Sequence, residues 1–445
     1  MNERVTPPDY RSFDDLPSQT EIGFGEIVGI DLSSHTSPFT HGLHRYPAKF
    51  IPQIPRWAIK ELSRPGEVVL DPFMGSGTTI VESLLADRVA HGIDLDPLAC
   101  LIAQAKTAQA NRLELRHLQE QLASSVLREE DNLIVPMAGV KNFEHWFSRA
   151  TWGTLQNIRN KILTLDCSEE SRAFLLCVFS SILRRVSNAD DQTQKTYVSG
   201  TLRKNPPAAR PTFFRALERA INSLDSFGVR ASETHAHIHR ASATAMPIAD
   251  QSIDLIVTSP PYLDSVDYMY NMMVEYFWLG DVLGIPHRKD FNAARKLSVG
   301  GKKSQISLPP PSCVSELIDF NELPDYRKAA AASYFSSMDE HFREAARVLK
   351  TGRQYVLVIG NSQTEKGQLP VHDALVSMAS THGFSLQHAF GYRIRRHYMK
   401  FPRKGRGGII LMDWVIILKN EGHGPTPLRR LPMPEILISP DAVAH

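Results

Sequence analysis

A short unit near residue 70 limits the folds that this chain can adopt. Residues 67–70 (EVVL) predict a buried strand, and DPFMGSGTT follows them before a helical apolar pattern begins. Residues 89–94 (VAHGID) predict a second strand one helix further on, and another helix begins near Pro97. Strand, helix, strand and helix in this order are typical of a parallel sheet covered by helices, so we expect an α/β protein.

A long helical insertion is expected to interrupt this sheet. The next strand patterns are THAHIHRAS at residues 234–242 and IDLIVTS at residues 253–259. The long segment between these strands and the first two indicates helices, because its apolar side chains recur at three- and four-residue spacing.

The last third of the chain predicts the far side of the sheet. Residues 290–326 contain SVGGKKSQ and LPPPS and show little periodicity, so we expect a mobile surface loop there. A helix that ends before Gly352 and the strand QYVLVIG follow. SLQHAFGYRIRR and GGIILMDWVIILK then predict two long strands joined by a basic loop. The expected fold is a Rossmann-like sheet with helices on both faces, an antiparallel C-terminal hairpin and a helical insertion.

The stretch DLIVTSPPY, residues 254–262, ends a predicted strand in two prolines and an aromatic residue. Because prolines fix φ and cannot donate a backbone hydrogen bond, Pro260 and Pro261 would stop the strand and leave a rigid carbonyl at its end. SPPY alone is commonly a surface turn. After an apolar strand and downstream of the glycine turn, it is expected to line a site.

The glycine turn is a second candidate for ligand binding. Gly75 and Gly77 would let the backbone turn sharply and approach a ligand near a helix N-terminus, although a bare G-x-G also fits an ordinary tight turn. No lysine follows the second glycine, so a triphosphate site is not expected. Asp94 ends the next strand, where an acid can accept hydrogen bonds from ribose hydroxyls, and Asp96 beyond the strand end is the less favoured substitute.

Composition limits the environment of the chain. The 445 residues are 42% hydrophobic, and a net charge of +2 with 50 Lys and Arg means that any polyanion-binding surface must come from local clusters. Cys100, Cys167, Cys177 and Cys313 are widely spaced without a C-x-x-C pair, which favours a reducing, cytoplasmic setting. No apolar run approaches the roughly 18 residues that a membrane span requires, so no membrane association is expected.

Three motifs together resemble the DNA amino-methyltransferases, which methylate the exocyclic amine of cytosine or adenine with S-adenosyl-L-methionine. VVLDPFMGSGTT resembles the cofactor motif of the family, TSPPY resembles its catalytic motif, and HRYPAKFIPQIP resembles the segment before the first strand. The resemblance is strong over residues 40–105 and 235–275 and looser over 384–419. It implies a methyltransferase sheet, S-adenosyl-L-methionine as cofactor and double-stranded DNA as substrate, with no metal.

The resemblance also implies roles for single residues. Asp71, Phe73, Gly75 and Gly77 would line the methionine side of the cofactor, and Asp94 would take the ribose. The segment at residues 46–50 would lie near the other side of the cofactor, where Phe50 is favoured as the packing aromatic over an ordinary core phenylalanine. The residues assigned to cofactor binding are Tyr46, Lys49, Phe50, Asp71, Phe73, Gly75, Gly77, Thr78, Asp94 and Ser242.

The catalytic residues implied are Ser259, Pro260, Pro261 and Tyr262. An aromatic amine is a weak nucleophile, so acceptors at Ser259 Oγ and the Pro260 carbonyl would hold its nitrogen in line with the methyl group. Tyr262 would stack on a base that has been flipped out of the duplex. Methylation of a ring carbon would need a cysteine after a proline, and no cysteine of the chain follows one.

The identity of the methylated base rests on Ser259. In the family, Ser at this position is associated with cytosine N4, and Asp or Asn more often with adenine N6. The sequence therefore predicts a cytosine-N4 methyltransferase, with an adenine-N6 methyltransferase as the alternative. An RNA or tRNA amino-methyltransferase and a catalytically silent DNA-binding module stay open, although no RNA-binding module is recognisable and the motifs are intact.

Basic clusters are candidates for contacts with DNA phosphates, although any one of them can be an ordinary solvated face. They lie at residues 195–215, 294–303 and 393–406. The residues assigned to DNA binding are Arg393, Arg395, Arg396, Lys400, Arg403, Lys404, Lys302 and Lys303. No nuclease motif is recognisable, so DNA cleavage would need a separate restriction endonuclease, and the recognition sequence and oligomeric state stay open.

The resemblance divides the chain into units. The expected units are an N-terminal segment (1–39), a first methyltransferase part with the cofactor motif (40–109), a helical insertion and DNA-recognition region (110–232), a second part with the catalytic motif (233–280), a mobile loop (281–330), a last part (331–424) and a tail (425–445). His235, His237 and His239 alternate as they would on one face of a strand, and without a supporting Cys or acid cluster we expect no metal there.

Overall fold

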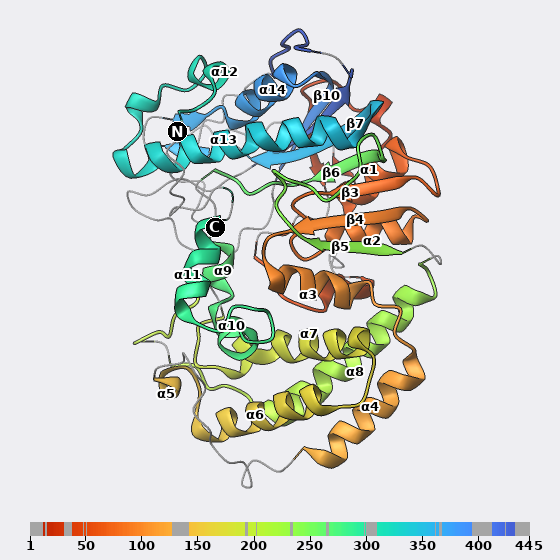
Figure 1. Cartoon of the computed structure of the whole chain (residues 1–445), viewed down its shortest axis with the longest axis vertical. Helices are drawn as coiled ribbons and strands as arrows, with labels where there is room; N and C mark the ends of the chain where they lie inside the picture. Colours follow the sequence, from red (N-terminus) through yellow and green to blue (C-terminus); the bar gives the residue numbers. More distant parts are fainter. Residues whose placement is uncertain are drawn as a thin grey trace, which may run out of the picture.

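The computed structural model shows a mixed α/β protein (Figure 1). The structure describes residues 12–13, 16–30, 38–47, 49, 51–126, 142–191, 195–201, 203–231, 235–263, 267–297, 299, 309–360, 362–364, 367–393, 412–422 and 424–431.

A nine-stranded sheet forms the centre of the fold, in the order β1-β2-β10-β11-β7-β6-β3-β4-β5. Its strands are β1 (Ser12–Phe13), β2 (Ile27–Ile30), β3 (Val68–Asp71), β4 (Val89–Asp94), β5 (Ala236–Arg240), β6 (Ile253–Thr258), β7 (Leu349–Gly360), β10 (Phe384–Arg393) and β11 (Met412–Asn420). Strands β5, β4, β3, β6 and β7 are parallel, and β11 pairs antiparallel with both β7 and β10. The predicted Rossmann-like sheet with an antiparallel C-terminal hairpin is therefore confirmed.

The central strands are apolar because both faces of the sheet are buried. Successive residues of a strand point to opposite faces, and in β6 Leu255 and Val257 join one apolar cluster whereas Ile256 joins another. In β3 the neighbours Val69 and Leu70 divide in the same way. A continuous run of β-branched and aliphatic residues is thus what a parallel sheet covered on both faces requires.

Helices cover both faces of the sheet, as predicted. They are α1 (Gln53–Leu62), α2 (Thr78–Leu85), α3 (Pro97–Lys106), α4 (Arg112–Ser125), α5 (Phe143–Trp146), α6 (Arg149–Thr164), α7 (Glu169–Val186), α8 (Ala209–Gly228), α9 (Tyr268–Asn271), α10 (Met273–Leu279), α11 (Arg288–Leu297), α12 (Ser312–Ser315), α13 (Asp325–Val348) and α14 (Val371–Thr381). Helices α13 and α14 pack on one face, and α1 packs on the other (Figure 1). Short 3-10 turns at Gln19–Glu21, Phe39–Gly42 and Phe320–Glu322 and a small hairpin, β8 (Ser362–Thr364) with β9 (Gly367–Leu369), complete the described elements.

The helical insertion lies below the sheet in Figure 1. Helices α4 to α8 fall between β4 and β5 in sequence, and α7 packs against α3. One apolar cluster runs from α2 and α3 through the insertion to α10, with Trp152 and Trp278 fully buried at its centre and their rings 4.4 Å apart. The insertion therefore shares its core with the sheet domain.

Two sequence predictions differ from the structure. The first is the loop expected at residues 281–330, which contains α11, α12 and the beginning of α13, and the second is the helix expected after the double proline. Residues 288–297, which we expected to lie in a loop, form the helix α11. Its sequence is mostly charged and polar, and Phe291 is its one buried residue, so few apolar side chains mark it as a helix. An ion pair between Arg295 and Asp267 joins it to the start of α9. The single helix expected after the double proline is divided at Met272 into α9 and α10.

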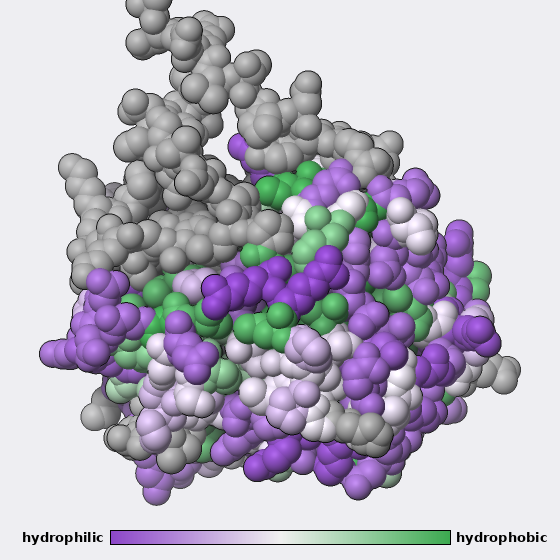
Figure 2. All heavy atoms as spheres, turned by 90° about the horizontal axis from the view of Figure 1, so that it is seen from above, coloured by the Kyte–Doolittle hydropathy of each residue, from purple (hydrophilic) through white to green (hydrophobic). Residues whose placement is uncertain are grey.

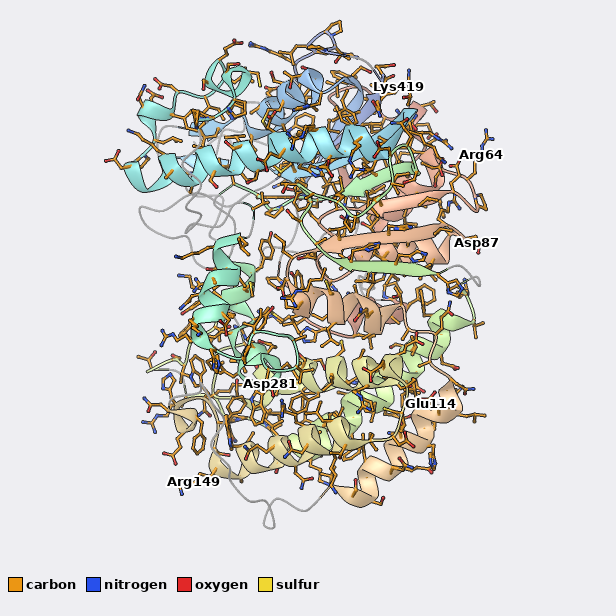
Figure 3. The ribbon with its side chains drawn as sticks, viewed as in Figure 1. Arg64, Asp87, Glu114, Arg149, Asp281 and Lys419 are labelled. Carbon is orange, nitrogen blue, oxygen red and sulfur yellow. The ribbon has the colours of Figure 1, made fainter. Side chains whose placement is uncertain are left out.

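The surface is largely polar. Figure 3 labels six charged side chains, of which Arg64, Asp87 and Arg149 lie at the outline of the molecule in this view. Figure 2 shows the face above α13 and α14, where polar side chains separate the apolar patches. Among the described helices, none is long and apolar enough to cross a bilayer. Cys100, Cys167, Cys177 and Cys313 are free thiols.

Truncation of the central strand should destabilise the protein strongly. Ile256 is 0% exposed, so Ile256→Ala should lower the free energy of unfolding by about 2–5 kcal/mol through lost burial and a residual cavity. Leu297 is 69% exposed, and Leu297→Ala should change the same quantity by less than about 0.5 kcal/mol. Urea unfolding followed by circular dichroism checks both, and equal effects would contradict the assigned core.

Candidate active site

The two sequence motifs meet where β3 and β6 end. These strands are parallel neighbours at the centre of the sheet, and from β3 the chain continues to β4 on the opposite side from β6. Crevices at such switch points are where open α/β sheets bind ligands. The Thr258 hydroxyl donates a 2.7 Å hydrogen bond to Asp71 Oδ1, so the last residues of the two strands are joined directly.

Asp71 is held in place by several donors. It is 1% exposed, and it also accepts a hydrogen bond from the Phe73 amide at 3.1 Å. Burial raises the pKa of Asp71 to about 6, against the hydrogen bonds that favour its ionised form. Such a carboxylate fixes the turn that follows β3.

The glycine turn adopts the backbone that its sequence requires. Gly75 has φ +49° and Gly77 has φ +77°, both in the left-handed region that glycine tolerates best. A Cβ on Gly77 would lie 3.0 Å from Ala103 Cβ, and one on Gly75 would lie 3.1 Å from the Tyr46 ring. The glycines therefore serve both the turn and close packing of the backbone, and α2 begins directly after them at Thr78.

Asp94 closes the turn from the neighbouring strand. Its Oδ2 accepts the Gly75 amide at 2.9 Å and its Oδ1 accepts the Asp96 amide at 2.8 Å. Burial, together with the nearby charge of Asp96, raises the pKa of Asp94 to about 7. Asp96 instead caps α3 by accepting from the Leu98 amide, and it accepts a hydrogen bond from Tyr276. Asp96 is 6% exposed, whereas Asp94 is half-buried, so Asp94 is the acid that is more open to a ligand at the strand end.

The segment before α1 covers the turn. Tyr46 stacks on Tyr268 of α9 with ring centroids 6.3 Å apart and lies against Gly75. Lys49 Nζ donates to the His41 carbonyl at 2.8 Å, so this side chain joins two parts of the segment. Phe50 lies outside the described residues.

A buried ion cluster fastens this segment to α2. His41 Nε2 lies 2.7 Å from Glu82 Oε1, and Arg56 donates to the same carboxylate at 2.9 Å. Although burial opposes it, these hydrogen bonds lower the pKa of Glu82. The segment is thus joined to the same helix that follows the glycine turn.

The remaining predicted cofactor residues lie around the same strand ends. Phe73 is half-buried and packs edge-on against His341, with centroids 4.8 Å apart. Ser242 follows β5, and its hydroxyl is 2.9 Å from that of Thr244. Thr78 is 3% exposed in the first turn of α2.

The double-proline motif directly follows β6. Pro260 is buried, whereas Ser259, Pro261 and Tyr262 are half-buried. Burial raises the pKa of Tyr262 well above its ordinary value, as do Asp413 and Tyr392 of the C-terminal hairpin, and the nearby Ser259 hydroxyl opposes that rise. Tyr262 therefore lies between Ser259 and the hairpin.

Two residues near this site were missed or only hinted at by the sequence. Lys106 is 0% exposed, and its Nζ donates to the Ser76 carbonyl at 2.8 Å and to the Ser76 hydroxyl at 3.1 Å, beneath the glycine turn. Burial lowers its pKa well below the usual value. In sequence, Lys106 looks like the solvated cation that commonly ends a helix. Asp413 was also missed, and the signal that could have found it is an acid within an apolar strand.

The predicted DNA-binding residues are only partly described. Arg393 is exposed at the end of β10, at the same edge as the double proline, whereas Arg395, Arg396, Lys400, Arg403, Lys404, Lys302 and Lys303 lie outside the described residues. In the other basic segment, Lys204 forms a 2.9 Å ion pair with Asp191 and also donates to the Arg184 carbonyl.

The histidines of β5 stack on a neighbour. The His91 ring lies 4.6 Å from that of His237 and 5.5 Å from that of His239. Burial and the other two histidines lower the pKa of His91 to about 4. Within the described ranges, no group of three His, Cys, Asp or Glu side chains could hold a metal ion.

Known proteins resemble the chain along most of its length. A family profile described as DNA methylase matches residues 27–105. The type II methyltransferase M.MvaI of Kocuria varians is 25% identical over 404 residues, which cover 84% of this chain and 86% of the relative. The type II methyltransferase M.BsoBI of Geobacillus stearothermophilus is 21% identical over 60% of this chain and 57% of its own. Among solved structures, an S-adenosylmethionine-dependent methyltransferase of Methanosarcina mazei covers 85% of this chain and 98% of its own at 10% identity, with a loose TM-score of 0.30.

The sheet and its site define an α/β methyltransferase. The DNA methylase profile over residues 27–105 and the similarity to type II methyltransferases along most of the chain support the DNA amino-methyltransferase family. The chain is accordingly a DNA methyltransferase.

The described residues fit S-adenosyl-L-methionine as the cofactor. A left-handed glycine turn brings backbone close to the site, and the half-buried Asp94 carboxylate lies at the neighbouring strand end. Acidic and aromatic groups around an amide-rich turn suit a nucleoside that carries hydroxyls and a cationic sulfur.

Substitution of Gly77 should damage cofactor binding more than stability. Gly77→Ala would strain a left-handed backbone and press a methyl group onto Ala103, so we expect at least about a tenfold rise in the Kd for S-adenosyl-L-methionine. Gly66→Ala is the matched control, because Gly66 has φ +84° and nothing lies within 4 Å of the position that its new methyl group would take. Both should lose about 1 kcal/mol of stability. Calorimetric titration that shows equal affinities for the two variants would contradict the role of the turn.

Proposed function

We propose that the chain transfers a methyl group from S-adenosyl-L-methionine to the exocyclic N4 amine of a flipped-out cytosine in double-stranded DNA. The observation that carries the choice of base is Ser259, a neutral hydroxyl at the first position of SPPY, directly after β6. Adenine N6 is the alternative, because both bases present an amine beside a ring nitrogen.

Two acceptors would position the amine. Ser259 Oγ and the Pro260 carbonyl would accept its two hydrogens and turn its lone pair toward the methyl group. The prolines keep the carbonyl rigid, and the Thr258–Asp71 hydrogen bond fixes the strand end that carries both acceptors. The Tyr262 ring, supported by the hairpin, would pack against the base.

The cofactor would lie across the ends of β3 and β4. When bound, it supplies an electrophilic methyl group. Asp94 would accept the ribose hydroxyls, and Asp71, Phe73, Gly75, Gly77 and Thr78 would border the methionine part. Tyr46 covers the turn from the opposite side, and Lys106 would act as a positioning residue through Ser76.

DNA would approach the edge where the parallel strands end. Arg393 lies at this edge because β10 and β7 are both antiparallel to β11, and β7 is parallel to β6. Helices α4 to α8, the segment expected at residues 110–232, would supply part of the recognition surface. A partner endonuclease would complete a restriction system, as the type II relatives suggest.

The base is identified by mass spectrometry of nucleosides from DNA of cells that express the protein. We expect N4-methylcytosine above the level of cells without the gene. N6-methyladenine without N4-methylcytosine would overturn the choice of cytosine, and methylated RNA with unmodified DNA would favour the RNA alternative.

Ser259→Ala should separate transfer from cofactor binding. Loss of one acceptor for the amine should lower kcat by about a hundredfold, while the Kd for the cofactor stays within about twofold. Ser124→Ala is the control, since Ser124 is exposed on α4 and its hydroxyl donates to the Gln121 carbonyl of the same helix. Full activity of Ser259→Ala would remove this residue from the mechanism.

Cofactor affinity should depend on the ionisation of Asp94. Its pKa is about 7, so the carboxyl is protonated in the free protein below that pH and must lose a proton before it accepts two hydroxyls. The Kd should therefore rise up to about tenfold per pH unit below 7 and level off above it.

Asp94→Asn should bind the cofactor more weakly, and its Kd should no longer rise below pH 7. Any pH dependence that remains in this variant would come from other groups. Calorimetric titration at several pH values checks the prediction. The same slope in both proteins would exclude Asp94 as the titrating acceptor.

A further inference from the structure

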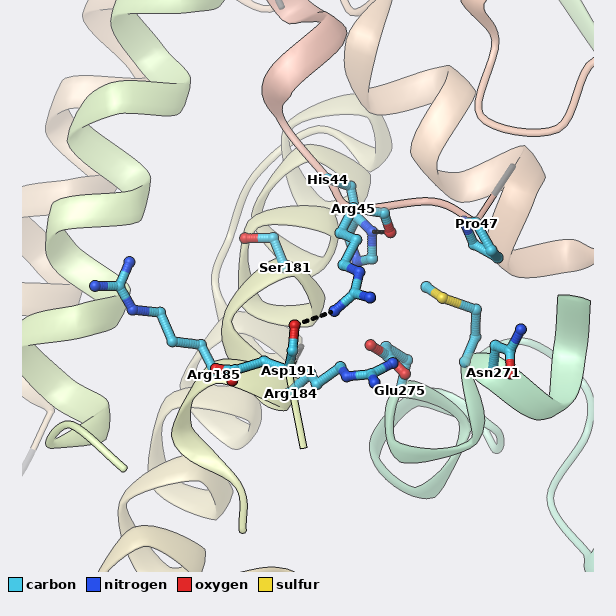
Figure 4. Close-up of a pocket in the computed structure, with 10 residues that line it drawn as sticks. His44, Arg45, Pro47, Ser181, Arg184, Arg185, Asp191, Asn271 and Glu275 are labelled. Carbon is cyan, nitrogen blue, oxygen red and sulfur yellow. Dashed lines mark hydrogen bonds between the residues drawn. The ribbon is translucent and has the colours of Figure 1, made fainter. Parts of the chain in front are cut away.

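A polar pocket lies between the helical insertion and the helices that follow the double proline (Figure 4). Its volume is about 460 Å³, within the range of small-ligand sites. Arg45 comes from the segment before α1, Arg184 from the end of α7, and Asn271 and Glu275 from α9 and α10. None of the four SPPY residues lines it.

Two buried side chains of the pocket have unmet hydrogen-bonding needs. Asn271 and Glu275 are each 3% exposed. Within the part of the chain that the structure describes, Asn271 Nδ2 has no acceptor and Glu275 Oε2 has no donor. Since a buried polar group without a partner costs about 1–3 kcal/mol, the pocket is suited to a ligand that supplies both partners.

Charge and shape narrow the class of ligand. A phosphate group offers acceptors alone, so it could satisfy Asn271 but would place its charge against the Glu275 carboxyl. Figure 4 shows the Arg184 guanidinium reaching toward Glu275, whereas Arg185 points away. Pro47 and Met272 add apolar walls that could contact the flat face of a ring.

A nucleobase meets these requirements. Adenine, cytosine and guanine each carry an amino group, which donates, close to a ring nitrogen or carbonyl oxygen, which accepts. Thymine lacks the amino group. Burial raises the pKa of Glu275 to about 7 while Arg184 and Arg45 oppose that rise, so the carboxyl retains an acceptor oxygen in either protonation state.

We propose that this pocket reads one base of the DNA recognition sequence other than the base that is methylated, with Glu275 accepting from the amino group of that base and Asn271 donating to its neighbouring acceptor. The inference rests on the proposed function. The helical insertion and the part of the chain that carries the catalytic motif would then read this base together, because α7 and α10 line the same pocket.

Glu275→Gln in the full-length protein tests the proposal. The change keeps the size of the side chain and replaces one acceptor oxygen by a donor, so discrimination at one position of the recognition sequence should fall about tenfold to a hundredfold. Modification-sensitive sequencing of DNA from expressing cells should then show methylation at sites that differ from the original sequence at that single position. Asn271→Ala should relax the same position.

Ser181→Ala is the matched control, since Ser181 lines the same pocket but its hydroxyl donates to the Val178 carbonyl on its own helix. It should keep the original sequence preference. Melting temperature and cofactor Kd show whether each variant is folded. If Glu275→Gln does not fold, Asn271→Ala tests the proposal in its place.

Two results would overturn the proposal: an unchanged sequence preference in folded Glu275→Gln and Asn271→Ala, or a change confined to the methylated base. Failure of the proposed function has a different signature, because wild-type protein would then leave DNA unmethylated or would methylate adenine N6 in place of cytosine N4.

Discussion

The hydrogen bond from Thr258 to Asp71 is the contact on which the site depends. It joins the ends of β6 and β3 at 2.7 Å in a place that solvent does not reach. Hydrogen bonds to ionised groups contribute about 1.5–3 kcal/mol when buried. Because Ser259 follows Thr258 and the glycine turn follows Asp71, this one contact sets the position of two motifs that are nearly 190 residues apart in sequence.

The residues around that contact hold both motifs in position. The glycine turn is fixed from three sides: Asp94 holds the Gly75 amide, Lys106 holds Ser76, and Tyr46 lies against Gly75. Burial of the Lys106 ammonium group costs free energy, and its hydrogen bonds to the Ser76 carbonyl and hydroxyl oxygens offset part of that cost. In the same way, Asp413 and Tyr392 of the C-terminal hairpin hold Tyr262 in position.

The sequence predicted the strands of the central sheet from β3 onward, because they are apolar runs bounded by glycine and proline. It did not predict β1 and β2, which lie in the expected N-terminal segment (1–39). It also predicted that the insertion is helical, since α4, α6 and α7 carry a regular apolar stripe. It missed α11, whose sequence is mostly charged and polar and which buries only Phe291. Lys106 and the pocket around Glu275 could not be predicted, because their burial depends on packing between α3, α7 and α10 and no local pattern reports such contacts.

The central claim is that the glycine turn, Asp94 and the double proline form a single active site at the ends of β3, β4 and β6. A crystal structure of the protein with S-adenosyl-L-homocysteine tests it most directly. We predict ribose hydroxyls within hydrogen-bonding distance of the Asp94 carboxylate and a sulfur atom that faces Ser259 and Pro260. A nucleoside bound in the pocket of Arg45 and Glu275, or a ribose remote from Asp94, would contradict it.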